Sequence, residues 1–510
     1  MSARGSPDNA SPLHSPPSSK PRYKRDEIPQ IPFPYNAPVR STSAATIGRI
    51  PNAASLRSII KEDSLGRSII TPIAVAIGPY YRCTPPAGVF HRLEHHQQPV
   101  RHETARIIRA GHKSIPPAAA SWGHHPHLHE MEDAKRAAVD EFCRVTGNPL
   151  ETVAEKIASV AGAARGCYAD DDLEVQDIDD GEFTGMLLLD ACFLLQFMVS
   201  MCPDDPDTTT PEEDPLMSRA EVHNRIDAIV RDILLFENQI PWLVLQALIE
   251  LRPAVPVDRF LALLASAFHV GNDEKLASAA RSAGDGDADD DHRQPQPPHL
   301  LALFHRRQVG AARTQSLRVP RLPSLSSTAV ELAEMGVMLT ASSSKKFGDM
   351  AMSKRLWRGL GLGIYGELSL APVVLNGLIE CWLVNLAAYE AFLGATRADN
   401  FAVSSYIAVV ALLMNKEEDV RELRAKGIVC STHGDSGVLS FFKGLAPHLR
   451  VGHRYYSVFQ SLQEYRQERW LWIPVHSFFY KHFKTIVAVL SAIGVVVGLF
   501  KTILSLKQPQ

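Results

Sequence analysis

The pattern of apolar and polar positions is most informative over residues 229–248, where two apolar stretches with helical spacing flank a polar interruption. The interruption consists of Glu237, Asn238 and Gln239, and Pro241 follows two residues later. Proline lacks an N–H and restricts the residue before it, so one helix must stop or kink here, or a second must begin with proline in its first turn. The Asn and Gln side chains are expected to bond backbone groups that the break leaves unpaired. The pattern predicts a fold-defining polar corner in a helical core, with a ligand site as the alternative.

Helical periodicity predicts the structure of much of the remaining chain. Apolar residues recur at every third or fourth position, which places them on one face of a helix. The further ranges predicted to be helical are 129–145, 149–168, 182–202, 257–269, 326–339, 375–393, 403–414, 417–426 and 455–472. A β-like run is predicted for 69–79, and short strands around Gly-rich turns for 360–374. The predicted fold class is mainly α, with a minor element of short strands and one C-terminal transmembrane helix.

Charged positions within two of the predicted helices need partners. Glu132 and Lys135 lie three residues apart and are expected to pair on the exposed side of their helix. Asp190 lies in a very apolar helix, and a carboxylate buried there must find a partner or a proton. Asp190 therefore joins the polar corner as a candidate structural residue.

The last apolar segment has the composition of a membrane span. Residues 485–500 carry no charge, and the apolar character resumes after Lys501. A transmembrane helix needs about 20 apolar residues, so this one is long enough only if the Lys501 side chain snorkels to the bilayer surface. We predict a transmembrane helix over 484–506, with a buried core helix as the alternative.

One face of this predicted span carries small side chains. Ser491, Gly494 and Gly498 lie on it, and small residues let two membrane helices approach closely, so this face is a candidate contact for a homo-oligomer. A chance occurrence in a Gly- and Val-rich tail is the alternative. The chain opens on a polar, proline-rich stretch rather than a secretory signal, which predicts a single-pass protein with a cytosolic N-terminal body. We favour the plasma membrane over endomembranes.

Composition separates an ordered body from two segments that cannot form a core. Residues 1–45 are rich in Ser and Pro, and 271–298 carry an acidic low-complexity run, so both are predicted to be disordered. The body is predicted to span 46–480. A formal net charge of −3 argues against a nucleic-acid partner. The seven cysteines include no CxxC pair and indicate reduced thiols in the cytosol.

None of the short motifs defines a catalytic, cofactor or metal site. Gly361, Gly363 and Gly366 spell G-x-G-x-x-G, but a strand-like sequence rather than a helix follows, so nucleotide binding is not expected. The Gly-Asp-Ser-Gly sequence at 434–437 lacks the other protease motifs and is interpreted as a loop. The histidine-rich run 124–129 is expected to bind metal only adventitiously. We therefore assign no catalytic residue, no cofactor and no metal ligand.

Several motifs occur in an order that resembles a known plant family. They are IGRIP at Ile47, IGPYYR at Ile77, MEDAK at Met131, ARGCY at Ala164, FTGMLLLDACF at Phe183, DILLFENQIPWLVL at Asp232 and NLAAYE at Asn385. The set resembles the family called domain of unknown function 247 over about residues 47–506. One departure is Tyr81, which stands where the family usually has histidine.

The resemblance implies a plant membrane protein with one C-terminal span and no established catalytic activity. Some members are implicated in grass pollen–stigma recognition. Carried over by position, the motif residues are Asp190, Asp232, Glu237, Asn238, Gln239 and Pro241. The resemblance supplies no proven role for them.

These observations predict a membrane-anchored plant protein that acts through contacts with an unknown protein partner, in recognition or signalling. One alternative is an enzyme with an unrecognised carboxylate site around Asp190 and Glu237. It would lack a nucleophile, base and oxyanion donor in any recognisable arrangement. A second alternative is a membrane scaffold without a regulated partner.

Overall fold

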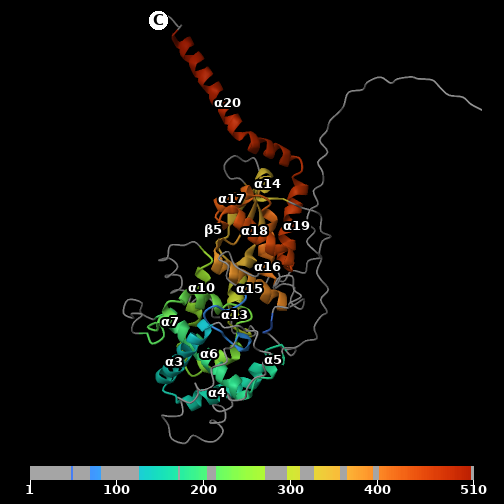
Figure 1. Cartoon of the computed structure of the whole chain (residues 1–510). Helices are drawn as coiled ribbons and strands as arrows, with labels where there is room; N and C mark the ends of the chain where they lie inside the picture. Colours follow the sequence, from blue (N-terminus) through green and yellow to red (C-terminus); the bar gives the residue numbers. More distant parts are fainter. Residues whose placement is uncertain are drawn as a thin grey trace, which may run out of the picture. The chain divides into compact units, whose positions relative to one another are not determined.

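The computed structural model of the chain is mainly helical, with a few short strands (Figure 1). It describes residues 47–49, 69–81, 126–169, 173–203, 214–269, 296–310, 327–356, 364–393 and 401–506. The predicted disordered segment 1–45 and nearly all of 271–298 lie outside the described residues, so both remain predictions.

The first half of the described body packs around one apolar helix, α6. Its elements are η1 (Pro79–Tyr81, a 3₁₀ helix), α3 (Pro126–Thr146), α4 (Leu150–Arg165), α5 (Leu173–Gln176), α6 (Asp180–Met201), α7 (Ala220–His223), α8 (Ile226–Asp232), α9 (Trp242–Ile249) and α10 (Val257–Ser266). Helices α3, α4 and α9 pack against α6, whose apolar side chains are buried around most of its circumference. A helix that is apolar on all sides belongs in a core, and α6 does so here.

The second half combines helices with the strands. Its elements are α13 (Leu300–Val309), α14 (Ala329–Glu334), β1 (Val337–Ala341), η5 (Phe347–Asp349), β2 (Ala351–Leu356), β3 (Ile364–Leu370), β4 (Val373–Leu375), α15 (Gly377–Leu393), α16 (Ala402–Leu413), α17 (Glu417–Ala425), β5 (Val429–Ser431), α18 (Asp435–Leu445), η7 (Ala446–His448), α19 (His453–Glu468) and α20 (Trp472–Leu506). Most residues of α15 and α16 are buried, and Trp382 of α15 is among the largest fully buried side chains. The buried side chains of both halves form one continuous hydrophobic cluster.

Two small sheets accompany these helices. β3 pairs in parallel with β1 and antiparallel with β2, which gives the strand order β1-β3-β2. β4 pairs in parallel with β5. The strands predicted within 360–374 are therefore confirmed as β3 and β4, whereas β1, β2 and β5 were not predicted.

Two predictions of local structure were wrong. Residues 69–78 form no strand, and much of this buried segment is instead bound by side chains of the helices around it. The helix predicted over 326–339 ends at Glu334, because Gly336 adopts a positive φ of 81° and the chain then continues as β1. The sequence of a buried apolar run does not show whether its backbone groups bond another strand or the side chains of neighbouring helices.

Other differences concern a turn, a charge and a helix. The Gly-Asp-Ser-Gly sequence at 434–437 is the start of α18 rather than a loop, with Gly434 as its N-cap residue. Lys135, predicted on the exposed side of α3, is only 4% exposed. Helix α13 was not predicted.

Helix α20 begins twelve residues before the predicted start of the span at 484 and reaches Leu506. Its portion Trp472–Thr502 is long and apolar enough to cross a membrane, and none of its most apolar stretch is buried. The helix α6 also meets the length and composition criteria, but 67% of its most apolar stretch is buried in the body. α20 is therefore the candidate membrane span of the described chain.

Candidate functional site

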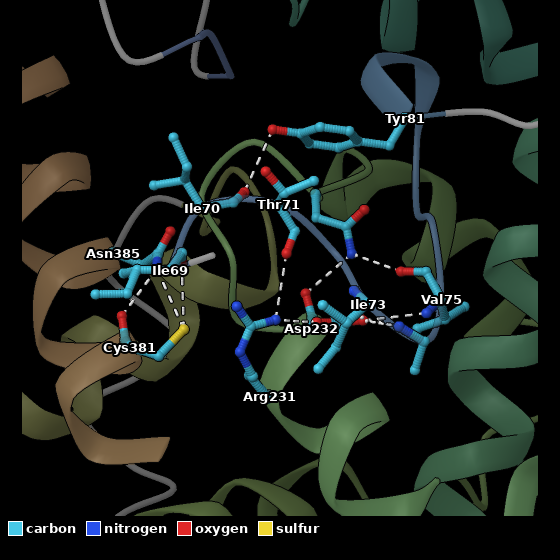
Figure 2. Close-up of polar contacts among 12 residues, drawn as sticks. Ile69, Ile70, Thr71, Ile73, Val75, Tyr81, Arg231, Asp232, Cys381 and Asn385 are labelled. Atoms are coloured by element: carbon cyan, nitrogen blue, oxygen red, sulfur yellow. Dashed lines mark hydrogen bonds and ion pairs between the residues drawn. The ribbon is translucent and has the colours of Figure 1, made fainter. Parts of the chain in front are cut away.

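The buried segment Ile69–Tyr81 is held by polar side chains that come from distant parts of the chain (Figure 2). Ala74 and Val75 are fully buried. Backbone groups buried without strand or helix partners must find other hydrogen bonds. We call the polar side chains that bond this segment or the helix ends beside it the clamp; its members are Lys135, Asp190, Arg231, Asp232, Glu237, Asn238, Gln239 and Asn385.

Asp232, the last residue of α8, makes the most concentrated set of bonds in the clamp. Its Oδ2 accepts the N–H groups of Ile73, Ala74 and Val75 at 2.8, 2.6 and 3.1 Å. Its Oδ1 is paired with Nη1 of Arg231, which also donates to the carbonyl oxygen of Thr71. A carboxylate that accepts several N–H groups beside a guanidinium is a strong anchor for a chain segment. Asp232 therefore fixes the path of the segment along α8.

Asn238 continues this anchoring from the break between α8 and α9. Its Oδ1 accepts the N–H of Ile77 at 2.7 Å. Its Nδ2 donates to the carbonyl oxygens of Val75 at 3.0 Å and of Asp232 at 2.9 Å. One amide thus joins the segment to the open end of α8.

Gln239 binds the carbonyl oxygens that the end of α8 leaves unpaired. Its Nε2 donates to those of Ile233 and Leu235 at 2.8 and 2.9 Å. Its Oε1 accepts the N–H of Leu301 in the first turn of α13, at 3.0 Å. Gln239 therefore bonds the free carbonyl groups at the end of α8 and a free N–H group at the start of α13. Helix ends leave such groups without partners inside the helix, and an amide can bond both kinds.

Pro241 marks where the chain becomes helical again. It is the N-cap residue of α9, with φ −59° and ψ 138°, and Trp242 is the first helical residue. The N–H of Trp242 donates to the carbonyl oxygen of Pro298 at 2.7 Å. Helix α8 stops well before the proline, and a separate helix begins directly after it.

Asp190 and Lys135 hold the end of the segment from two other helices. Asp190 Oδ2 accepts the N–H of Gly78 at 2.8 Å, and Asp190 Oδ1 lies 2.7 Å from Lys135 Nζ. Lys135 also donates to the carbonyl oxygen of Ala76 at 2.7 Å and to Glu132 at 2.8 Å. The carboxylate inside the apolar helix α6 thus has both a cation and a backbone partner.

Glu237 and Asn385 complete the clamp at the two ends of the segment. The hydroxyl of Tyr81 donates to Glu237 Oε2 at 2.7 Å. Nδ2 of Asn385 in α15 donates to the carbonyl oxygen of Ile69 at 3.0 Å, and its Oδ1 accepts the N–H of Phe236 at 2.9 Å. Tyr81, the position where the chain departs from the family pattern, is therefore a contact of the clamp.

Burial changes the acid–base behaviour of the clamp. It raises the pKa of Asp190 to about 6, against the opposing effect of Lys135. It also raises the pKa of Asp232 to about 6, against Arg231 and the three backbone N–H groups. Burial alone lowers the pKa of Lys135, but Asp190 and Glu132 outweigh it, and this pKa is raised. Each carboxyl group accepts backbone N–H groups and faces a cation, so both act as fixed hydrogen-bond partners of the segment.

The geometry of the clamp suits a structural role. The carboxylate oxygens of Asp190 and Asp232 accept hydrogen bonds from backbone N–H groups or form ion pairs with Lys135 and Arg231. Within the described ranges, no group of three or more His, Cys, Asp or Glu side chains is arranged to hold a metal ion. What the clamp can do chemically is bind an extended peptide segment, and the segment it binds is the chain's own.

The candidate residues of the span are separate from the clamp. Ser491, Gly494 and Gly498 all lie on α20 and are exposed. A Cβ atom added to Gly494 or Gly498 would meet no atom within 4 Å. Their face is therefore open for a close approach by another helix.

Sequence reasoning missed Lys135, Arg231 and Asn385 as parts of the site. Asn385 opens the NLAAYE motif, and Glu390, which closes it, accepts the N–H groups of Val403 and Ser404 at the start of α16. The available signal was the one used for Asp190, a polar side chain inside an apolar helix. Applied to α15, that signal would have found Asn385.

The fold and the site describe a mainly helical protein whose core encloses an N-terminal segment and which carries one long, exposed apolar helix. The sequence profile of a family described as "Plant protein of unknown function" matches residues 62–497, and the chain belongs to this family, domain of unknown function 247. A similar protein, the UPF0481 protein At3g47200 of Arabidopsis thaliana, is 26% identical over 346 residues, which cover 62% of this chain and 66% of that protein. No solved structure matches the chain.

Proposed function

We propose that α20 anchors this protein in a membrane and that the helical body acts there through contacts with other proteins, in recognition or signalling. The observation that carries the proposal is the exposure of α20. Among the described residues, all large hydrophobic side chains that are exposed lie between Trp470 and Phe500, except for Val145, Leu263 and Met338. An exposed apolar surface of this extent marks a membrane or protein contact.

The membrane is favoured over a protein groove by the length and uniformity of α20. The portion Trp472–Thr502 has 31 residues, and a span needs about 20. Over residues 485–500 its exposed side chains point in every direction around the helix rather than along one stripe. A groove would cover one face, whereas the lipid of a bilayer surrounds the helix completely.

The body is placed on the cytosolic side in this proposal. Arg469, Lys481 and Lys484 precede the most apolar part of α20, against Lys501 and Lys507 after it, and cytoplasmic flanks of membrane spans carry an excess of such residues. The plasma membrane is favoured because recognition between cells takes place there. The partner is a protein whose contacts with the body define the process.

The membrane anchor is tested on the full-length chain with a charge pair in the span. Val495→Arg together with Val496→Arg places two cations in the hydrocarbon, each unfavourable by about 2.5–3.5 kcal/mol, and Val495→Leu together with Val496→Leu is the matched control. We expect the parent and the control to resist carbonate extraction, with the body open to protease from the cytosolic side, and the arginine variant to be extracted. Equal extraction of all three would remove the anchor, and a protected body would reverse the orientation.

Self-association through Ser491, Gly494 and Gly498 is a separate part of the proposal. Gly494→Leu with Gly498→Leu fills the open face and is expected to lower energy transfer between labelled copies in a bilayer. Val496→Leu with Val497→Leu adds one methylene to each of two side chains outside the small-residue face and serves as the control. If the glycine variant associates as the parent does, this face does not form the homo-oligomer.

A further inference from the structure

The first turns of α20 are attached to the body by polar contacts with one residue of α14. The Nδ1 atom of His476 lies 2.9 Å from the carbonyl oxygen of Glu334. Lys481 Nζ lies 2.9 Å from the Glu334 carboxylate, and the Ser477 hydroxyl donates to it at 3.5 Å. These contacts give the base of α20 a side that faces the body.

The other side of the same turns is apolar and exposed. Helical periodicity places three large side chains away from the contacts with Glu334. They are Val475, Phe478 and Phe479, with exposed fractions of 44%, 57% and 54%. Trp472 and Phe483, each 64% exposed, lie nearer the His476 side of the helix and are open to the surroundings as well. The base of α20 is therefore an amphipathic helix that is held along its polar side and open along its aromatic side.

The length of α20 indicates what surrounds this aromatic side. The 31 residues Trp472–Thr502 extend over about 46 Å at 1.5 Å per residue. The hydrocarbon core of a bilayer is about 30 Å thick, and about 40–45 Å with the headgroup regions. The apolar helix thus matches the whole membrane, so its first turns coincide with a headgroup region. Tryptophan and tyrosine are enriched at that depth in membrane proteins.

The charged side chains from residue 469 onward are all basic, and the carboxylate of Glu334 in the body pairs with one of them, Lys481. No Asp or Glu occurs after Glu468, whereas Arg469, Lys481 and Lys484 are cationic. Lys484 is exposed and has no ion pair within the part of the chain that the structure describes. A basic juxtamembrane segment attracts anionic lipids through the negative surface potential of the cytoplasmic leaflet.

An exposed apolar residue of the body lies close to the same region. Gly336 is near enough to His476 that an added Cβ would lie 3.4 Å from the imidazole ring. Met338 follows two residues later on the edge strand β1 and is 48% exposed. The body therefore presents an apolar side chain close to the base of α20.

We propose that residues 469–484, which we call the collar, lie in the headgroup layer on the body's side of the membrane and bind anionic phospholipid headgroups through Arg469 and Lys484. The contacts with Glu334 then hold α14 and the edge strand β1 at the membrane surface. The collar rests on the proposed membrane anchor, because without a spanning α20 it has no fixed depth.

The depth of the collar is measured by tryptophan quenching in full-length protein reconstituted into phosphatidylcholine vesicles. The chain has six tryptophans, and the difference from Trp470→Phe with Trp472→Phe isolates the two in question. Lipids brominated near the headgroup are expected to quench this difference signal more than lipids brominated deep in the acyl chain. Stronger deep quenching, or none, overturns the collar. Carbonate resistance of both proteins shows separately whether α20 is inserted.

Quenching of Trp470 and Trp472 also measures whether the collar prefers anionic phospholipids. Brominated phosphatidylserine and brominated phosphatidylcholine are compared as quenchers, each as about a third of the lipid, and phosphatidylserine is expected to give at least about twofold more quenching. The ratio of quenching by phosphatidylserine to quenching by phosphatidylcholine is expected to fall to about one in the variant Arg469→Gln with Lys484→Gln. Lys501→Gln, which removes a cation from the opposite end of the span, is expected to leave the ratio at its parent value.

The remaining outcomes identify what else covers the aromatic side. A ratio of one in the parent removes the anionic lipid from the proposal. Cross-links between Phe479→Cys copies, together with absent quenching, assign this side to a second chain and overturn the collar. Carbonate extraction of the parent, in contrast, removes the membrane anchor itself.

Discussion

The clamp and the helix α20 depart in opposite directions from the usual arrangement of polar surface and apolar core. In the clamp, Asp190 and Arg231 are 1% exposed and Asp232 is not exposed at all. In α20, the large apolar side chains from Trp472 to Phe500 that are exposed show at least 44% of their surface. One region buries charge and the other exposes hydrocarbon, within the same chain.

The difference lies in where each region finds its partners. The charges of the clamp are bound by the segment Ile69–Tyr81 and by one another, so their burial is explained inside the molecule. The apolar side chains of α20 have almost no protein around them in the described chain. The clamp therefore explains how the body is held together, and α20 points to what the body is attached to.

The strongest test of this comparison removes the anchor of the buried segment. Asp232→Ala deprives three N–H groups of their acceptor and leaves Arg231 without its carboxylate, so a loss of about 3–5 kcal/mol in unfolding free energy is expected. Urea denaturation of the full-length protein in detergent measures it. Asp227→Ala changes an exposed carboxylate of the same helix α8 and is expected to stay within about 0.5 kcal/mol. Equal losses in the two variants would show that the clamp does not stabilise the body.

A second test concerns the close approach of the segment to the corner. Gly78 has φ +75°, and a Cβ added there would lie 2.5 Å from the Gln239 carbonyl oxygen. Gly147 has φ +68° but no atom within 4 Å of an added Cβ. Gly147→Ala is expected to lose about 1 kcal/mol from backbone strain, and Gly78→Ala about 1–3 kcal/mol more because the carbonyl must move. Thermal unfolding measures the loss of stability in the two variants. Equal losses would mean that the Gln239 carbonyl group moves away from the added Cβ at no cost.

The third test uses pH. The pKa of Asp190 is raised from 3.8 to about 6 by burial, so the folded chain binds this proton more tightly than the unfolded chain does. The stability that this group contributes is fully present below 3.8 and is lost as pH rises through 6. Acidification from about pH 7 to about pH 5 should therefore stabilise the parent relative to Asp190→Asn by about 1–2 kcal/mol. Denaturation at both pH values measures this difference, and a change of opposite sign would contradict the burial argument.

The smallest expected effect concerns α20. Phe478→Ser with Phe479→Ser removes two exposed rings, and the unfolding free energy of the body is expected to change by no more than about 0.5 kcal/mol. Phe236→Ser, in which the ring is fully buried, should lose about 3–5 kcal/mol. A large loss from the exposed pair in detergent would show that the base of α20 packs on protein.

The sequence predicted the mainly helical class and the break before Pro241, because both depend on local patterns. The break between α8 and α9 follows from Pro241 and the polar residues before it, and α6, α15 and α16 follow from long apolar runs. The segment 69–79 was interpreted as a strand because its apolar residues are typical of one. Lys135 was placed on the surface because an i,i+3 pair with Glu132 is usually exposed.

By itself the sequence determined that the body is mainly helical, that a helix begins directly after Pro241 and that the last apolar segment could span a membrane, since each depends on residues close together in the chain. Only the tertiary structure decided what the polar residues bind. Ala74 and Asp232 are 158 residues apart, and Gly78 and Asp190 are 112 apart. A polar residue in an apolar helix shows that a partner is needed, but any of several buried segments could supply it. The partner is selected by packing of the whole core, because the lowest free energy is reached only when all buried polar groups are paired together.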